Sequence, residues 1–187
     1  MTLLDRFPDN LENKKIAWII RHSERLNNLD KLTEKGKKDA LNFAQKIKNL
    51  PIKAIYVSPS DRCIETGKII LSVFEQDIPL ILDNNIAEIG PYVINMQKAI
   101  ETYNSLGKEE FFRRLLADEK LEGYRIFSQA GKNITTFIKN NTIDYGITLF
   151  ITHNFIIRML KYYLGKLSYK HKIPSIKPLD GIIIDIN

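Results

Sequence analysis

Short apolar runs alternate along the chain with longer segments whose apolar residues recur every three or four positions. The short runs, rich in β-branched residues and bounded by polar ones, predict buried strands, whereas the longer spacing predicts amphipathic helices. The predicted strands are Ile16–Ile20, Ala54–Val57, Pro79–Leu82, Ile147–Ile151 and Gly181–Ile186. Because strands that alternate with helices favour a parallel sheet, we expect a three-layer α/β/α domain with a largely parallel central sheet.

Helix signals lie between these strands. Thr33 can cap a first helix, and Pro51 closes it. We expect helices from Thr33 to Leu50, from residues 58–61 to Phe74, from Asn95 to about Asn140 with breaks at Gly107 and Gly123, and after His153 as far as Gly165. No linker or internal repeat interrupts the pattern, so we take residues 1–187 as a single domain.

Composition narrows the classes of function. The 28 Lys and Arg residues exceed the 22 Asp and Glu residues and give a net charge of +6. These charges are scattered among acids in the manner of solvated helix faces, so we expect no nucleic-acid partner. The single cysteine, Cys63, excludes an intrachain disulfide. The longest apolar runs fall short of the ~20 residues that span a bilayer, and we expect a cytoplasmic protein with no membrane partner.

Polar side chains gather where three predicted strands end. The three sets are Arg21-His22-Ser23-Glu24-Arg25, Ser58-Pro59-Ser60-Asp61-Arg62 and Thr152-His153-Asn154. In open α/β sheets, ligands bind at the carboxyl ends of the strands. Guanidinium groups and helix N-termini both bind phosphate oxygens, and a neutral imidazole can attack phosphorus. The sets therefore predict a phosphate site with a histidine nucleophile.

These motifs resemble those of the histidine phosphatase superfamily, the group related to phosphoglycerate mutases. The resemblance spans nearly the whole chain and rests on Arg21-His22-Ser23-Glu24 with Asn28, Leu32-Thr33-Glu34-Lys35-Gly36, Ser58-Pro59 with Arg62 and Thr66, and His153 at the end of a late strand. Ser23 stands where the family usually has glycine, and Asn154 stands where glycine or aspartate is common. Neither departure removes a catalytic group.

The resemblance implies a role for each matched residue. His22 would be phosphorylated, while Arg21, Arg62 and His153 would hold the phosphoryl oxygens and stabilise the charge of the transition state. Asn28 would join the phosphate site. No metal ion or other cofactor is expected, because arginines and histidines supply the positive charge.

Two further assignments also follow from the resemblance. Glu88, shortly before Gly90, matches the family's usual proton donor, with Glu24, Asp83 and Glu101 as competing carboxylates. Arg25 resembles the extra phosphate-binding arginine of the acid-phosphatase branch, although the proline that usually follows is replaced by Asn27.

The leading hypothesis is a metal-independent phosphomonoesterase that acts through a phosphohistidine on a small phosphorylated molecule or a phosphoprotein. A phosphoglycerate mutase is the main rival, although its Gly-Glu-Ser element is missing between Gly123 and Ile134. A non-catalytic phosphate-binding module is the third alternative. We expect residues 83–128 to cover the substrate. Candidate contacts there are Tyr92, Tyr103, Arg113, Arg114 and Tyr124. The substrate itself and the oligomeric state stay open.

Overall fold

The computed structural model describes residues 11, 13–27, 29–167 and 175–186. Its elements in chain order are β1 (Lys15–Arg21), α1 (Glu34–Ile47), β2 (Ile52–Val57), α2 (Asp61–Leu71), β3 (Leu80–Leu82), the 3-10 helix η2 (Asn84–Ile86), α3 (Met96–Leu106), α4 (Lys108–Leu116), α5 (Phe127–Asn141), β4 (Gly146–Thr152), α6 (Asn154–Tyr163) and β5 (Gly181–Asp185). All predicted strands are present, and the four predicted helical regions contain the long helices.

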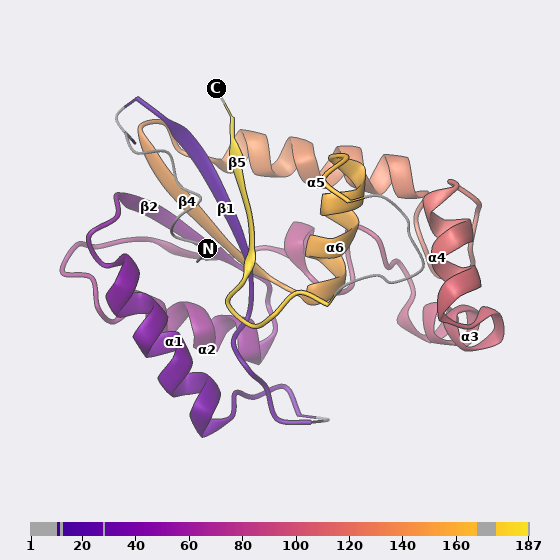
Figure 1. Ribbon diagram of the computed structural model, residues 1–187, viewed down its shortest axis with the longest axis horizontal. Coiled ribbons are helices and arrows are strands. Elements are labelled where there is room, and N and C mark those ends of the chain that lie inside the picture. The colour runs from indigo at the N-terminus through magenta and orange to yellow at the C-terminus, as the bar shows by residue number, and fades with distance from the viewer. Residues whose placement is uncertain (1–10, 12, 28, 168–174, 187) are drawn as a thin grey trace.

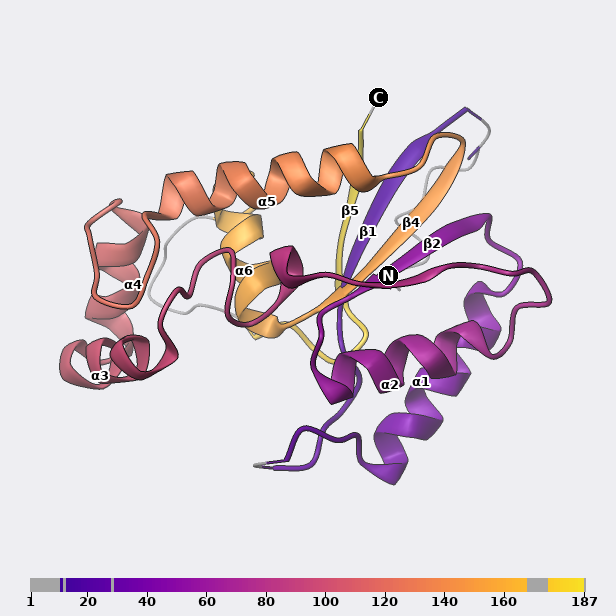
Figure 2. The same ribbon diagram turned by 180° about the vertical axis from the view of Figure 1, so that it is seen from behind.

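The five strands form one sheet in the order β3-β2-β4-β1-β5. The first four are parallel, and β5 runs antiparallel to β1 at the edge. Helices α1 and α2 cover one face of the sheet, and α5 and α6 lie on the other (Figures 1 and 2). The predicted three-layer α/β/α architecture with a largely parallel sheet is therefore confirmed. Strand β4, late in the sequence, lies between β1 and β2 and so joins distant segments.

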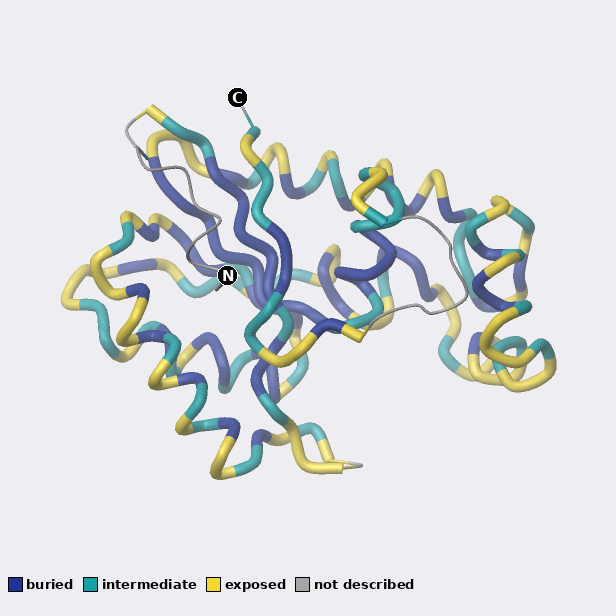
Figure 3. The backbone as a smooth tube through the Cα atoms, in the orientation of Figure 1, coloured by how far each residue is buried: buried dark blue, intermediate teal, exposed yellow. Residues whose placement is uncertain are grey.

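Strand β1 is buried on both faces and separates two hydrophobic cores. Ile16, Trp18 and Ile20 pack with α1 and α2, whereas Ala17 and Ile19 pack with α5 and α6. Side chains alternate across a strand, so a continuous apolar run is what two covered faces require. Figure 3 shows the resulting band of buried backbone through the centre of the sheet.

The middle of the chain extends away from the sheet. Helices α3 and α4 lie beyond α5 and α6, at the end of the molecule farthest from α1 (Figures 1 and 2). Gly107 separates them with a φ of 72°, a conformation that glycine adopts without steric cost. Residues 117–126, around the predicted break at Gly123, form no helix before α5 begins. None of the helices in the described ranges is both long and apolar enough to cross a membrane.

Three local predictions differ from the structure. The last strand was expected to be fully buried, but β5 is an edge strand in which Ile183 and Ile184 are partly exposed. A run of apolar residues does not reveal whether both sides of a strand are covered. The first two helices end earlier than predicted, at Ile47 and Leu71, so Leu50 and Phe74 pack from the turns that follow.

Candidate active site

The three polar sets meet at one edge of the sheet. Arg21 pairs with Thr152 in the register of β1 and β4, and Val57 pairs with Ile151 in that of β2 and β4. The backbone N–H of His22 continues the ladder by donating to the Thr152 carbonyl at 2.9 Å. His22 and His153, which are 131 positions apart, consequently lie side by side with ring centroids 5.6 Å apart.

The turn after His22 is held against the start of α1 and the middle of α2. The backbone N–H of Ser23 donates to Thr66 Oγ1 at 3.1 Å, and the Ser23 hydroxyl donates to the Gly36 carbonyl at 2.7 Å. A Cβ at Gly36 would collide with the backbone oxygen of Glu24, so this close approach requires glycine. Ser23 in place of the usual glycine therefore directs its hydroxyl to α1 and forms a satisfied hydrogen bond there.

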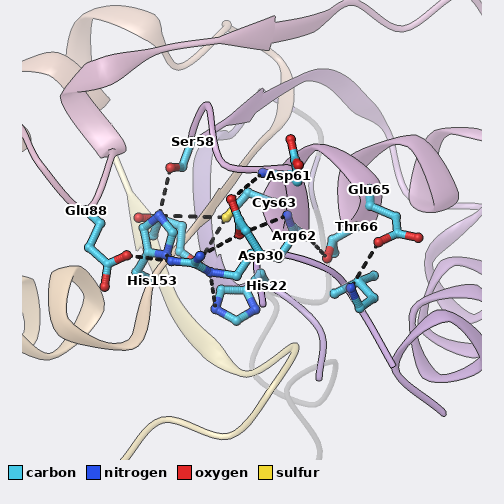
Figure 4. A network of polar contacts seen from close by, with 12 residues as sticks. His22, Asp30, Ser58, Asp61, Arg62, Cys63, Glu65, Thr66, Glu88 and His153 are labelled. Carbon is cyan, nitrogen blue, oxygen red and sulfur yellow. Dashed lines mark hydrogen bonds and ion pairs between the residues drawn. The ribbon is translucent and has the colours of Figure 1, made fainter. Parts of the chain in front are cut away.

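Arg62, at the start of α2, lies at the centre of the site (Figure 4). Its Nε donates to His22 Nε2 at 3.3 Å, and its Nη2 donates to His153 Nδ1 at 2.9 Å. The guanidinium also pairs with Asp30 at 2.5 Å and with Glu88 at 2.6 Å. Its side chain is only 7% exposed. A single guanidinium thus connects both histidines with two carboxylates.

Hydrogen-bond partners assign the proton on each imidazole. His22 Nδ1 lies 2.7 Å from the Ser23 carbonyl, which can only accept, so Nδ1 carries the proton. His22 Nε2 then presents its lone pair towards Arg62. For His153 the order is reversed, because Nδ1 accepts from Arg62 and Nε2 lies 2.7 Å from the Ser58 hydroxyl, to which it donates.

Both histidines are buried beside positive charge. Loss of hydration lowers the pKa of His22 to about 3, with His153, Arg62 and Arg21 lowering it further and the Ser23 carbonyl opposing the shift. Loss of hydration, followed by the charge of Arg62, lowers the pKa of His153 to about 3 as well. A neutral imidazole keeps its lone pair near neutral pH, which a nucleophile needs.

Glu88 reaches the site from the far side of Arg62. The Thr152 hydroxyl donates to the Ile86 carbonyl at 2.6 Å and fixes the end of η2 to the end of β4. At Gly90 the chain turns back so closely that a Cβ would collide with the Asn84 oxygen. The Glu88 side chain is 51% exposed, so it has both a guanidinium partner and access to solvent.

Asp30 is a site residue that the sequence interpretation missed. Its carboxylate accepts from the backbone N–H groups of Asp61 at 2.9 Å and Arg62 at 3.4 Å, in addition to the Arg62 guanidinium. These contacts lower the Asp30 pKa although its burial acts against the shift. Ser60, the N-cap residue of α2, makes no side-chain capping bond, and Asp30 satisfies the helix end instead. No local motif marks Asp30, because it lies far from α2 in sequence.

Two of the predicted phosphate ligands lie at the margin of this network. Arg21 Nη1 donates to the Ile176 carbonyl at 2.6 Å, and burial followed by the charges of Arg25 and Arg62 lowers its pKa. Arg25 is exposed. Its charge nevertheless contributes to the lowered pKa of His153. Asn28 lies outside the described residues.

Asn154, the second departure from the family motifs, has a structural contact. Its side-chain oxygen accepts from the backbone N–H of Ile176 at 2.8 Å. Together with Arg21, which binds the carbonyl of the same residue, Asn154 fixes the segment before β5 against the site. Asparagine at this position therefore holds the backbone of the segment before β5.

Solved structures of similar fold include both mutases and phosphatases. A phosphoglycerate mutase from Bacillus anthracis superposes with a TM-score of 0.69 and 19% identity, covering 93% of this chain and 88% of its own. A mycobacterial glucosyl-3-phosphoglycerate phosphatase superposes with a TM-score of 0.59 and 14% identity, covering 89% of this chain and 87% of its own. At these identities the likeness concerns the fold alone.

Sequence comparison extends the similarity. A 2,3-bisphosphoglycerate-dependent phosphoglycerate mutase from Thermoplasma acidophilum is 29% identical over 183 residues, which cover 92% of this chain and 88% of the relative. The family model of the histidine phosphatase superfamily, branch 1, matches residues 17–175, a range that includes every predicted site residue. The chain belongs to the histidine phosphatase superfamily.

Proposed function

We propose that the protein is a metal-independent phosphomonoesterase that forms a phosphohistidine on His22. The observation that carries the proposal is the Nε2 lone pair of a neutral, buried His22, which faces the Arg62 guanidinium at 3.3 Å. A phosphoryl group bound to Arg62 would place its phosphorus beside this nitrogen. The positive charge that stabilises the phosphoryl oxygens would come from arginine, so the proposed reaction requires no metal ion.

The first step transfers the phosphoryl group to His22. Phosphoryl oxygens bind Arg62 and displace His22 Nε2 from its Nε and Glu88 from its Nη2. The displaced Glu88 carboxylate then takes up a proton from the solvent. Nε2 of His22 attacks phosphorus, the N–P bond forms, and the P–O bond to the substrate alcohol breaks. Glu88 in its acid form donates a proton to the departing oxygen. Arg62 and His153, with Arg21 nearby, stabilise the charge on the phosphoryl oxygens.

The second step returns the enzyme to its starting state. A water molecule attacks the phosphorus of the phosphohistidine, and Glu88, now a carboxylate, accepts a proton from it. The N–P bond breaks and its electron pair returns to His22 Nε2. Inorganic phosphate leaves, and Arg62 can pair with Glu88 again. Glu88 releases the proton that it gained in this step to the solvent, which balances the proton taken up before the first step and restores the carboxylate.

Phosphoglycerate mutase activity is the second candidate. The relative from Thermoplasma acidophilum is a 2,3-bisphosphoglycerate-dependent phosphoglycerate mutase, and its 29% identity extends over most of both chains. A mutase would return the phosphoryl group from His22 to another oxygen of the organic molecule instead of to water. The two activities thus share the first step and differ in the acceptor of the second.

The decisive comparison measures both acceptors with the same enzyme preparation. Release of inorganic phosphate from p-nitrophenyl phosphate is followed in the presence of EDTA, and interconversion of 2- and 3-phosphoglycerate is followed with 2,3-bisphosphoglycerate added. We expect phosphate release that EDTA does not reduce and that exceeds isomerisation. Isomerisation faster than phosphate release would replace this proposal with the mutase. A loss of phosphate release in EDTA would contradict the metal-independent mechanism.

A further inference from the structure

A cavity opens beside the site residue Glu88. It has a volume of about 260 Å³ and extends from Glu88 along α3 to Tyr124 and Phe155. Phe155 is two residues beyond His153 in the first turn of α6. The cavity and the Arg62 network therefore share one side chain, Glu88, and one helix start. We call this cavity the apolar pocket.

Aromatic side chains form the inner wall of the apolar pocket. Tyr103 and Tyr124 both pack against Phe111, with ring centroids 5.1 and 4.9 Å away, and Tyr124 also lies 6.4 Å from Phe155. The Tyr124 hydroxyl donates to the Ala99 carbonyl at 3.2 Å, so that its polar end is already bonded. Rings held by several neighbours make a preformed apolar surface.

The outer rim of the apolar pocket is also apolar. Ile100 lines the pocket and is 48% exposed. An isoleucine in this position leaves apolar surface in contact with water, which a bound apolar group would cover. Ile100 thus extends the apolar wall outwards, and Asn104 adds an amide to the lining.

The described lining of the apolar pocket holds no cation. Of the described residues that line it, Glu88 alone is charged. Of the nearby cations, Lys98 on α3 pairs with Glu122 at 3.0 Å, and Arg158 on α6 lies over the Phe112 ring, 4.7 Å from its centroid. A carboxylate on the substrate would lose hydration here and find no lysine or arginine among these lining residues, whereas an uncharged group would contact rings and aliphatic carbon.

We infer that the apolar pocket binds the organic part of the substrate, and that the substrate is a phosphomonoester of an uncharged, apolar alcohol. The inference rests on the proposed function, because it assumes that the phosphoryl group binds Arg62. The ester oxygen then lies near Glu88, which contacts Arg62 on one side and lines the pocket on the other. An apolar cavity of about 150 Å³ accepts benzene, so about 260 Å³ suits a ring with a short alkyl chain.

Three primary alkyl phosphates test the inference, because their leaving alcohols are chemically alike. Ethyl phosphate has almost no organic part, 2-phenylethyl phosphate carries an apolar ring, and 3-phosphoglycerate carries a carboxylate. For the full-length protein we expect kcat/KM for phosphate release from 2-phenylethyl phosphate to exceed that for ethyl phosphate by about tenfold or more. We expect 3-phosphoglycerate to be the poorest of the three.

A matched pair of variants identifies the surface responsible. Ile100→Lys places a cation at the rim of the pocket, whereas Ile94→Lys makes the same change at an exposed isoleucine just before α3 that is not among the lining residues. We expect Ile100→Lys to shift the kcat/KM ratio of 3-phosphoglycerate to 2-phenylethyl phosphate by about tenfold towards 3-phosphoglycerate. Ile94→Lys should leave that ratio as in the original protein.

The outcomes separate this inference from the proposed function. Equal kcat/KM for ethyl and 2-phenylethyl phosphate, with phosphate released from both, would overturn the inference and leave the phosphatase proposal intact. A preference for 3-phosphoglycerate in the original protein, or equal shifts from both lysine variants, would likewise overturn it. If none of the three esters releases phosphate and no phosphate is found on His22, the proposed function is refuted, and the inference with it.

Discussion

The polar cluster and the apolar pocket, which meet at Glu88, are built from different parts of the fold. The polar cluster consists of His22, Asp30, Ser58, Arg62, Glu88 and His153, and three of its members, His22, Ser58 and His153, come directly after the ends of strands β1, β2 and β4. The apolar pocket is formed mostly by α3 and the segment around Tyr124, away from the sheet. A rigid sheet fixes groups for chemistry, whereas peripheral helices can vary in size and charge. Reaction and selectivity should therefore be separable by substitution.

Replacing Arg62 by alanine should have the largest effect in the polar cluster. The guanidinium contacts both histidines and both carboxylates, so its loss removes the proposed charge stabilisation. We expect kcat/KM to fall by about 10³-fold for ethyl and 2-phenylethyl phosphate alike. Steady-state kinetics with both esters measure this. Arg113→Ala on α4 is the matched control and should change neither value; an Arg62→Ala loss below tenfold would contradict the account.

Glu88 lies between the polar cluster and the apolar pocket, and its amide variant should distinguish acid catalysis from binding. Glu88→Gln should lower kcat/KM about 10²-fold for ethyl phosphate, whose alkoxide needs a proton to depart. For p-nitrophenyl phosphate, whose phenolate is a good leaving group, we expect a loss of less than about tenfold. Asp30→Asn, which also changes a carboxylate on Arg62, should affect both esters equally. If Glu88→Gln lowers kcat/KM equally for ethyl phosphate and p-nitrophenyl phosphate, Glu88 has a binding role only.

The polar cluster should also make stability depend on pH. Burial lowers the folded-state pKa of His153 from 6.5 to about 3, so the unfolded chain binds more protons between these values. The free energy of unfolding must therefore fall as the pH falls through this window. Between pH 7 and pH 5 the free energy of unfolding of His153→Asn should therefore decrease by about 2 kcal/mol less than that of the original protein. Urea unfolding at both pH values measures this, and an unchanged pH dependence would contradict a buried neutral imidazole.

Ser58 should have the smallest of these effects, because it acts through His153. Its hydroxyl lies 2.7 Å from His153 Nε2 and fixes the proton on that atom. We expect Ser58→Ala to reduce kcat about fivefold, within the ~1 kcal/mol of a single hydrogen bond. Ser58→Thr, which keeps a hydroxyl, should restore most of the activity. Ser72→Ala, at the other end of α2, removes a hydroxyl bonded within its own helix and should change nothing.

The polar cluster was more predictable from the sequence than the apolar pocket. His22, Ser58 and His153 follow apolar runs directly, and parallel strands bring their carboxyl ends to one edge. Asp30 could not be predicted, because its contact with the start of α2 depends on how a loop packs. Tyr103 and Tyr124, two candidate contacts in residues 83–128, do line the apolar pocket.

Other candidates in that segment have partners elsewhere. Tyr92 is fully buried in the core. Arg113 pairs with Glu110, and Arg114 donates to Glu119 at 2.5 Å. The sequence around these five residues does not show which way each side chain points. Periodicity identifies the elements, but the packing of α3 and α4 against α6 decides which rings enclose a cavity.

Phosphate bound to His22 is the most direct test of the central claim. The protein is mixed with a phosphomonoester, quenched in alkali within one turnover and digested, and the peptides are examined by mass spectrometry. We predict acid-labile, alkali-stable phosphate on the peptide that contains His22, formed at least as fast as phosphate is released and absent from His22→Asn. Undiminished phosphate release by His22→Asn, or phosphate carried by another residue, would contradict the account.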